Sequence, residues 1–233
     1  MMTDDQRIQI AGYLLAEKLT VDVAMELHDH FCTHISALMQ KENISFNEAF
    51  DLTKDAWKAD LRLVKLGNGK FIPKINKEIG AQQERNVAVY AIFTAAVFLT
   101  VISAASHGLS SDHYSVFKTA IWSAAVLVPV VYFLFNIKDI AIAWRMKGLR
   151  LNTHQKSFAM VAPGYILMQN TIFSIESQAR IQDLFYGSFT KLDLATLVVA
   201  PLGLLAYFFG LLSMFKFIRH LRRTKPFLHF IKA

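Results

Sequence analysis

The densest set of potentially reactive side chains lies in the stretch ELHDHFCTHI, residues 26–35. It contains three histidines, one cysteine and two acids within ten residues. Histidine, cysteine and carboxylate side chains are the usual ligands of zinc. A cysteine beside a histidine can also act as a nucleophile. A metal site or a thiol-based active site is therefore the first chemistry to consider.

Helix geometry separates these side chains. An α-helix turns by about 100° per residue, so residues three or four apart share a face. Leu27 and Phe31 lie on the face that we expect to meet the core, and His34 falls in the middle of that face. His28 and Cys32 fall toward the other side. We therefore predict that His34 is a core histidine and that His28 contributes little to stability.

Only Glu26, His30 and His34 share one edge of this helix, each one turn from the next. A structural zinc site needs four protein ligands, and a catalytic site needs three plus water. No other histidine or cysteine of the first 85 residues completes such a set, although an acid could. No histidine is placed to activate Cys32 specifically. We predict no metal site, no catalytic residue and no cofactor.

Helical signals dominate the first 85 residues, which must position this stretch. Ser45 and Glu48 form a capping box, in which each residue satisfies the other's free backbone donor. Gly67 is a natural end for the helix that begins there. We expect helices over residues 3–18, 20–42, 45–66 and 73–84, with a core of Leu27, Phe31, Phe50 and Trp57.

Composition divides the 233 residues into a soluble part and a membrane part. Only 18% of the residues are charged and 54% are hydrophobic, whereas globular proteins are about 25% charged. Of the 18 acids, 13 lie before residue 86. We predict an all-α protein with a helical head over residues 1–85, a membrane bundle over 86–217 and a basic tail over 218–233. The single cysteine cannot form an internal disulfide, and we expect no signal peptide.

Four stretches are candidates to cross the membrane, since a span needs about 20 largely apolar residues. The third contains Pro163-Gly164 and then the polar pair Gln169 and Asn170. It is either a kinked span or a re-entrant segment that lines a polar cavity. The four expected spans are residues 87–105, 116–136, 158–175 and 194–215.

Charge predicts the orientation of these spans. The loop 137–157 and the tail after residue 215 together sum to +10, and the remaining two loops carry few basic residues. Basic loops remain on the cytoplasmic side, so we expect both termini in the cytoplasm and the protein in the inner membrane. These basic segments also favour anionic lipid headgroups as partners. The head carries 11 basic and 13 acidic residues, so we expect no nucleic-acid partner.

Residues 10–66 resemble the N-terminal helical domain of small multi-pass membrane proteins of Bacteroidota. The layout is similar to the HAAS and permease-prefix modules that precede membrane spans. The matching elements are Glu26-Leu27 and Asp29-His30-Phe31, then Ser45-Phe46 and Glu48-Ala49-Phe50, and finally Trp57 with the apolar pair Leu61 and Val64. The resemblance implies that the His-Phe element packs the second helix on the third. It also implies a role in regulation or assembly, beside PadR-like repressors or ABC-type permeases, and it supplies no catalytic residue.

Three functions are compatible with these features. We expect a non-enzymatic regulatory, adaptor or assembly role, in which the head binds a protein partner. The alternative is a small transporter or channel subunit with its polar feature at Gln169 and Asn170, although ion paths usually carry a charged residue deep in a span. An intramembrane enzyme is the third, and the spans hold no catalytic motif. The composition leaves homo-oligomerisation open.

Overall fold

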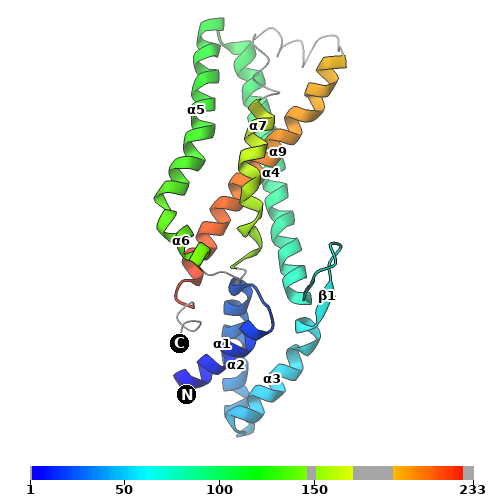
Figure 1. Ribbon diagram of the computed structural model, residues 1–233, viewed down its shortest axis with the longest axis vertical. Coiled ribbons are helices and arrows are strands. Elements are labelled where there is room, and N and C mark those ends of the chain that lie inside the picture. The colour runs from blue at the N-terminus through cyan, green and yellow to red at the C-terminus, as the bar shows by residue number, and fades with distance from the viewer. Residues whose placement is uncertain (1, 146–150, 170–190, 228–233) are drawn as a thin grey trace. The chain divides into compact units, whose positions relative to one another are not determined.

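The computed structural model describes residues 2–145, 151–169 and 191–227, and these residues are mostly helical (Figure 1). They divide into two compact units. Unit 1 contains residues 1–84, 139–153 and 217–233, and unit 2 contains residues 85–138 and 154–216. Segments that are distant in the sequence therefore build each unit.

Three helices form the head in unit 1, and their N-termini follow the sequence signals. They are α1 (Asp4–Ala16), α2 (Val21–Glu42) and α3 (Phe46–Leu61). Thr3 caps α1, and Ser45 with Glu48 forms the predicted capping box of α3. The amide and hydroxyl of Ser45 donate to Glu48, which holds the pKa of this carboxyl below its usual value. Thr20 precedes α2 as expected, but its side chain makes no capping hydrogen bond.

A β-hairpin follows α3, and the sequence analysis missed it. The helix ends at Leu61, and strands β1 (Leu63–Lys65) and β2 (Phe71–Pro73) pair antiparallel. Gly67 lies in the connecting turn and does not cap α3. Gly69 adopts a φ of 80° in the same turn, a conformation that glycine tolerates because it has no Cβ. The prediction of an all-α fold is therefore wrong at these residues.

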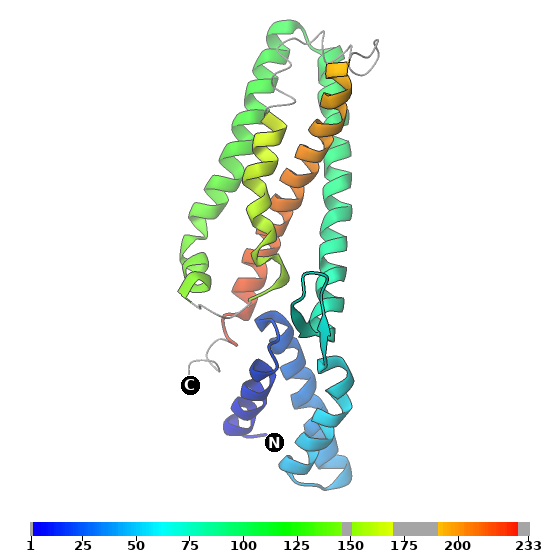
Figure 2. The same ribbon diagram turned by 45° about the vertical axis from the view of Figure 1, so that its right-hand side comes forward.

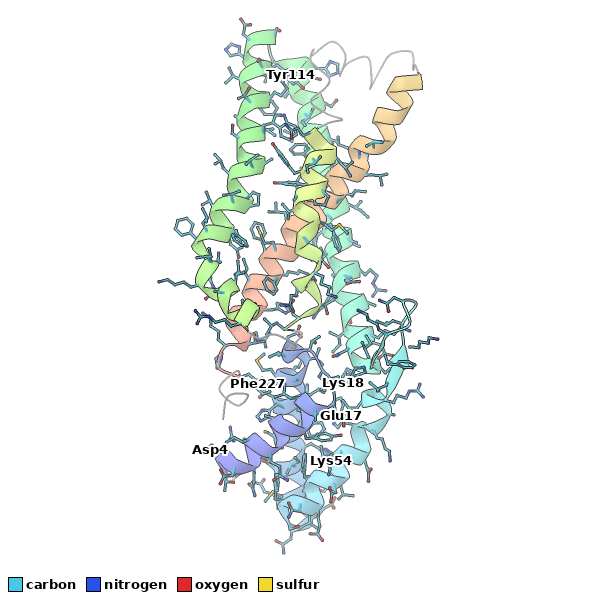
Figure 3. All side chains as sticks on the ribbon, viewed as in Figure 1. Asp4, Glu17, Lys18, Lys54, Tyr114 and Phe227 are labelled. Carbon is cyan, nitrogen blue, oxygen red and sulfur yellow. The ribbon has the colours of Figure 1, made fainter. Side chains whose placement is uncertain are left out.

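The core of the head lies between α2 and its two neighbours, since both α1 and α3 pack on α2. Leu27, Phe31 and Phe50 are buried as predicted, and Trp57 is only partly buried against the ring of Phe31. The Nζ of Lys54, labelled in Figure 3, lies 4.8 Å from the centre of the Phe50 ring. Aromatic rings, with the Lys54 ammonium over the ring of Phe50, thus cover the exposed edge of this core.

Unit 2 contains the greater part of the helices that are long and apolar enough to cross a membrane. Among the described residues these are α4 (Lys74–Gly108), α5 (Ser111–Phe135) and residues 201–224 of α9 (Lys191–Thr224). The predicted first and fourth spans lie within α4 and α9, and the predicted second span ends one residue past α5. Pro73 immediately precedes α4, as expected for a residue that fits a helix start but not its interior.

The predicted third span is described only in part. Residues Ser157–Met160 form a 3-10 helix, and Val161–Met168 form α7, which crosses α9 in unit 2 (Figure 2). The remainder of that span, including Asn170, lies outside the described residues. After α5, residues Ile137–Arg145 form the short helix α6.

Two close approaches hold α7 against α9. A methyl group on Gly164 would lie 2.3 Å from the amide nitrogen of Tyr207, and one on Gly210 would lie 2.4 Å from that of Val161. Each helix therefore presents a glycine to the backbone of the other. Small residues allow such backbone contact between membrane helices.

Candidate functional site

His28 is buried, which contradicts its predicted position on the outer side of α2. Its side chain is only 6% exposed. The Nε2 lies 3.1 Å from the carbonyl oxygen of Arg7, and because a carbonyl only accepts, the ring donates from Nε2. The ring of Phe227 packs edge-on at 5.4 Å between centroids, and Phe227 is labelled in Figure 3. His28 therefore joins α2 to α1 and to the C-terminal segment.

His34 is exposed, so its prediction as a core histidine is wrong. Its Nδ1 lies 3.3 Å from the hydroxyl oxygen of Thr53, and this hydroxyl donates to the carbonyl of Ala49 at 2.8 Å. His30 is also exposed, and its ring stacks on Trp57 at 6.2 Å. Both histidines thus contact α3 from the solvent side of the α2–α3 interface.

The error has a physical reason. The sequence analysis centred the core face near Leu27 and Phe31, but α2 is covered on a wider arc. Val21, Ala24 and His28 are buried with them, which turns the centre of the buried face by roughly 40° toward His28. Phe227 covers part of that arc from a segment nearly 200 residues away. A pattern within one helix cannot indicate such a distant partner.

Cys32 lies beside His28, on the side of α2 where the helix geometry placed both residues. Its sulfur is 3.7 Å from Nε2 and 3.8 Å from Nδ1 of His28. Burial raises the pKa of the Cys32 thiol, whereas a reactive cysteine needs a lowered pKa. The pair is therefore arranged for packing, and we assign it no nucleophilic role.

The structure does not bring Glu26, His30 and His34 together as a set of metal ligands. His30 and His34 are engaged with Trp57 and Thr53, and Glu26 lies against a separate recess. Among residues 2–145, 151–169 and 191–227, no group of three or more His, Cys, Asp or Glu residues is placed to hold a metal ion.

A polar recess of about 50 Å³ lies in unit 1 where α2, α4 and the end of α9 meet. Asp22 is its central acid, and its Oδ2 is 3.5 Å from Nδ1 of His220. The amide of Asp22 donates to the carbonyl of Leu151 at 3.1 Å. The Oε1 of Gln83 is buried here without a hydrogen-bond partner among the described residues. Such a site has room for a few water molecules that would satisfy these groups.

Asp139 forms a second polar link in unit 1, between α6 and the end of α9. It accepts a hydrogen bond from Lys225 and another from the Nε of Arg222 at 2.9 Å. The bond from Lys225, together with that from Arg222, holds the pKa of Asp139 below its usual value although burial opposes this shift. The single acid of the basic loop is therefore matched by two basic residues of the tail.

Sequence reasoning did not single out Asp22, His220 or Asp139 as a group. No local pattern marks them, because they come from α2, α9 and α6 and meet only in the fold. Gln169, the described half of the polar pair in the third span, is exposed at the end of α7. The arrangement in unit 1 can join three segments of the chain.

Comparisons of the chain with protein-family models, with curated proteins and with solved structures find no match.

Proposed function

We propose that the protein is a membrane-anchored regulatory or adaptor protein whose helical head is its working surface. The observation that carries this proposal is the set of chain segments that build unit 1. The head, the segment 139–153 and the end of α9 form one folded unit. The head folds together with the segment 139–153 and the end of α9. It is therefore suited to binding a partner on its surface and to transmitting this binding to the membrane helices.

The contacts within unit 1 also support four spans with both termini in the cytoplasm. Hydrogen bonds link Asp22 to Leu151, and Asn152 to the carbonyl of Phe217 at 3.4 Å. These residues must therefore lie on one side of the membrane. The chain leaves and returns through α4 and α5, and α9 crosses once. The predicted third span, residues 158–175, would supply the fourth crossing, and the basic loops favour the cytoplasm for unit 1.

The exposed face of the hairpin is the candidate partner surface. Leu63 is 49% exposed and Phe71 is 60% exposed. The register pairs Leu63 with Pro73 and Lys65 with Phe71, so Leu63 and Phe71 lie diagonally on one face. Diagonal neighbours are within reach of aromatic side chains. An exposed aromatic next to an aliphatic residue is the kind of anchor that protein interfaces use.

The test is crosslinking in native membranes, followed by mass spectrometry of the captured proteins. We expect the double variant Leu63→Ser, Phe71→Ser to lose a specific partner that the wild type captures. Leu52→Ser is the matched control, since Leu52 is 50% exposed on α3 and lies outside the hairpin. Hydrogen exchange of α2 in each variant would show that the head remains folded.

Two results would contradict the proposal. The first is an identical set of captured proteins for the wild type and both variants. The second is solute transport by the protein in liposomes that stops when Asn170 is changed to Ala, which would establish the transport alternative. Gln169, the described member of the polar pair on which that alternative rests, is exposed.

A further inference from the structure

An apolar groove of about 390 Å³ opens in unit 2 between α5 on one side and α7 with α9 on the other. Its walls are almost wholly apolar, and the hydroxyl of Tyr207 at its floor already donates to the carbonyl of Ala125 at 2.7 Å. Water has no partners in such a space. The lining side chains include Val126, Val130 and Leu134 of α5, Ala162 and Tyr165 of α7, and Met214 of α9.

The groove has the length of one membrane leaflet. Its wall on α5 extends from Ala125 to Leu134, which is about 14 Å at 1.5 Å per residue. Half of the hydrocarbon core of a bilayer is about 15 Å. Since α5 is a candidate span, the groove follows the direction in which a lipid chain lies.

Two lysines flank one end of the groove. Lys138 lies four residues after the lining residue Leu134, just past the end of α5 at Phe135. Lys156 begins the turn that contains the lining residue Ala159, whose amide donates to the Lys156 carbonyl at 3.2 Å. Both lysines are exposed, and neither forms an ion pair with a described residue. Exposed lysines at the membrane surface attract anionic headgroups.

We infer that this groove binds one acyl chain of an anionic phospholipid, with the phosphate held at Lys138 and Lys156. The apolar walls match the chain, the length matches one leaflet, and the positive charge lies where the headgroup would be. The inference requires that unit 2 is embedded in a membrane. It does not depend on the regulatory role of the head, so either can fail alone.

The test uses the full chain, reconstituted into bilayers of phosphatidylcholine that contain a small fraction of a photoreactive lipid. The probe is phosphatidylglycerol with a diazirine in one acyl chain, and the comparison is phosphatidylcholine with the same chain. Labelled peptides are identified by mass spectrometry. Ala162→Trp fills the groove, and Ala124→Trp is the matched control because Ala124 is exposed on α5 but does not line the groove.

We expect phosphatidylglycerol to label residues 125–134 and 159–165 above the other exposed apolar positions. Ala162→Trp should abolish this excess, and Ala124→Trp should retain it. Lys138→Gln and Lys156→Gln should each lower the preference for phosphatidylglycerol by about fivefold, since a lysine near an anionic surface contributes an effect of that size. Lys70→Gln, an exposed lysine of the hairpin, should leave the preference unchanged.

Three results would overturn the inference. Labelling that is uniform over α4 and α5 and insensitive to Ala162→Trp would mean bulk lipid only. Equal labelling by both lipids would remove the role of the two lysines. A groove that gives no lipid label, but crosslinks to a second copy or to residues 170–190, would have a protein occupant.

Discussion

Single buried side chains of the head connect it to distant segments of the chain. His28 donates to Arg7 and packs on Phe227, and Asp22 binds the Leu151 carbonyl through its amide. A buried polar group costs free energy unless it is paired. These residues therefore favour one arrangement of the segments in unit 1, because other arrangements would leave their polar groups unpaired.

His28 and His34 give a direct test at this scale. The sequence analysis predicted that His34 lies in the core and that His28 contributes little to stability, whereas the structure buries His28 and exposes His34. We expect His28→Ala to destabilise the protein by about 2 kcal/mol, because it removes a hydrogen bond and leaves a cavity. His34→Ala should change stability by less than about 0.5 kcal/mol, as for most exposed positions. The measurement is thermal or denaturant unfolding of the full chain in detergent.

His28→Gln is the control for this pair, since its amide can still donate to the Arg7 carbonyl and should restore part of the loss. Hydrogen exchange should report the effect in α1 and in residues 217–227. A larger effect of His34→Ala than of His28→Ala would restore the first assignment of the core face.

At the scale of elements, Pro129 leaves one backbone carbonyl of α5 without its helical hydrogen bond, and Tyr207 supplies a donor in its place. Proline has no N–H, so the carbonyl four residues earlier loses its helical partner. That carbonyl belongs to Ala125, and the hydroxyl of Tyr207 on α9 donates to it at 2.7 Å. In a membrane, neighbouring helices supply such missing hydrogen bonds. The hydrogen bond that α5 lacks at Pro129 is thus supplied by α9, and it joins the two helices.

A double-mutant cycle tests this link. Tyr207→Phe should destabilise the wild-type bundle by about 1 kcal/mol, because the Ala125 carbonyl is left unpaired. In the Pro129→Ala background the residue 129 amide can bond to Ala125, so the same change should cost much less. Unfolding in mixed detergent gives the four free energies. Equal costs in both backgrounds would mean that the hydroxyl acts independently of the proline.

The crossing of α7 and α9 is a second test at this scale. Gly164→Ala and Gly210→Ala place a methyl group against backbone atoms, and we expect each to cost about 1–3 kcal/mol through overpacking. Gly12→Ala in α1 is the control, because nothing lies within 4 Å of the added carbon. It should stabilise α1 by up to about 1 kcal/mol. Loss of stability in all three variants would point to a cause other than the crossing.

Elements that depend on local chemistry could be predicted from the sequence, and those that depend on distant partners could not. The capping box at Ser45, the start of α4 after Pro73 and the apolar length of α4, α5 and α9 are local properties. The hairpin has strands of three residues, which are too short to give an alternating pattern. The Asn68-Gly69 turn was the available signal. The roles of His28, Asp22 and Asp139 depend on residues 150–227.

At the scale of the whole molecule, the contacts within unit 1 constrain the number of membrane crossings. Unit 1 takes residues from before α4, from after α5 and from the end of α9. Contacts among these three segments require an even number of crossings between each pair. Three candidate spans lie in the described residues, and the fourth crossing that we propose is the predicted third span, residues 158–175.

Reporter fusions test this topology. A fusion after Lys225 should be active only with a cytoplasmic reporter, and an insertion near Ser110 only with an exported reporter, because basic segments remain inside. With three crossings in place of four, the fusion after Lys225 would be exported while the head stayed inside. That outcome would also separate Asp22 from His220, and Asp139 from Arg222, across the bilayer. A matched pair of reporters at Lys225, one of each kind, therefore decides between an odd and an even number of spans in a single measurement.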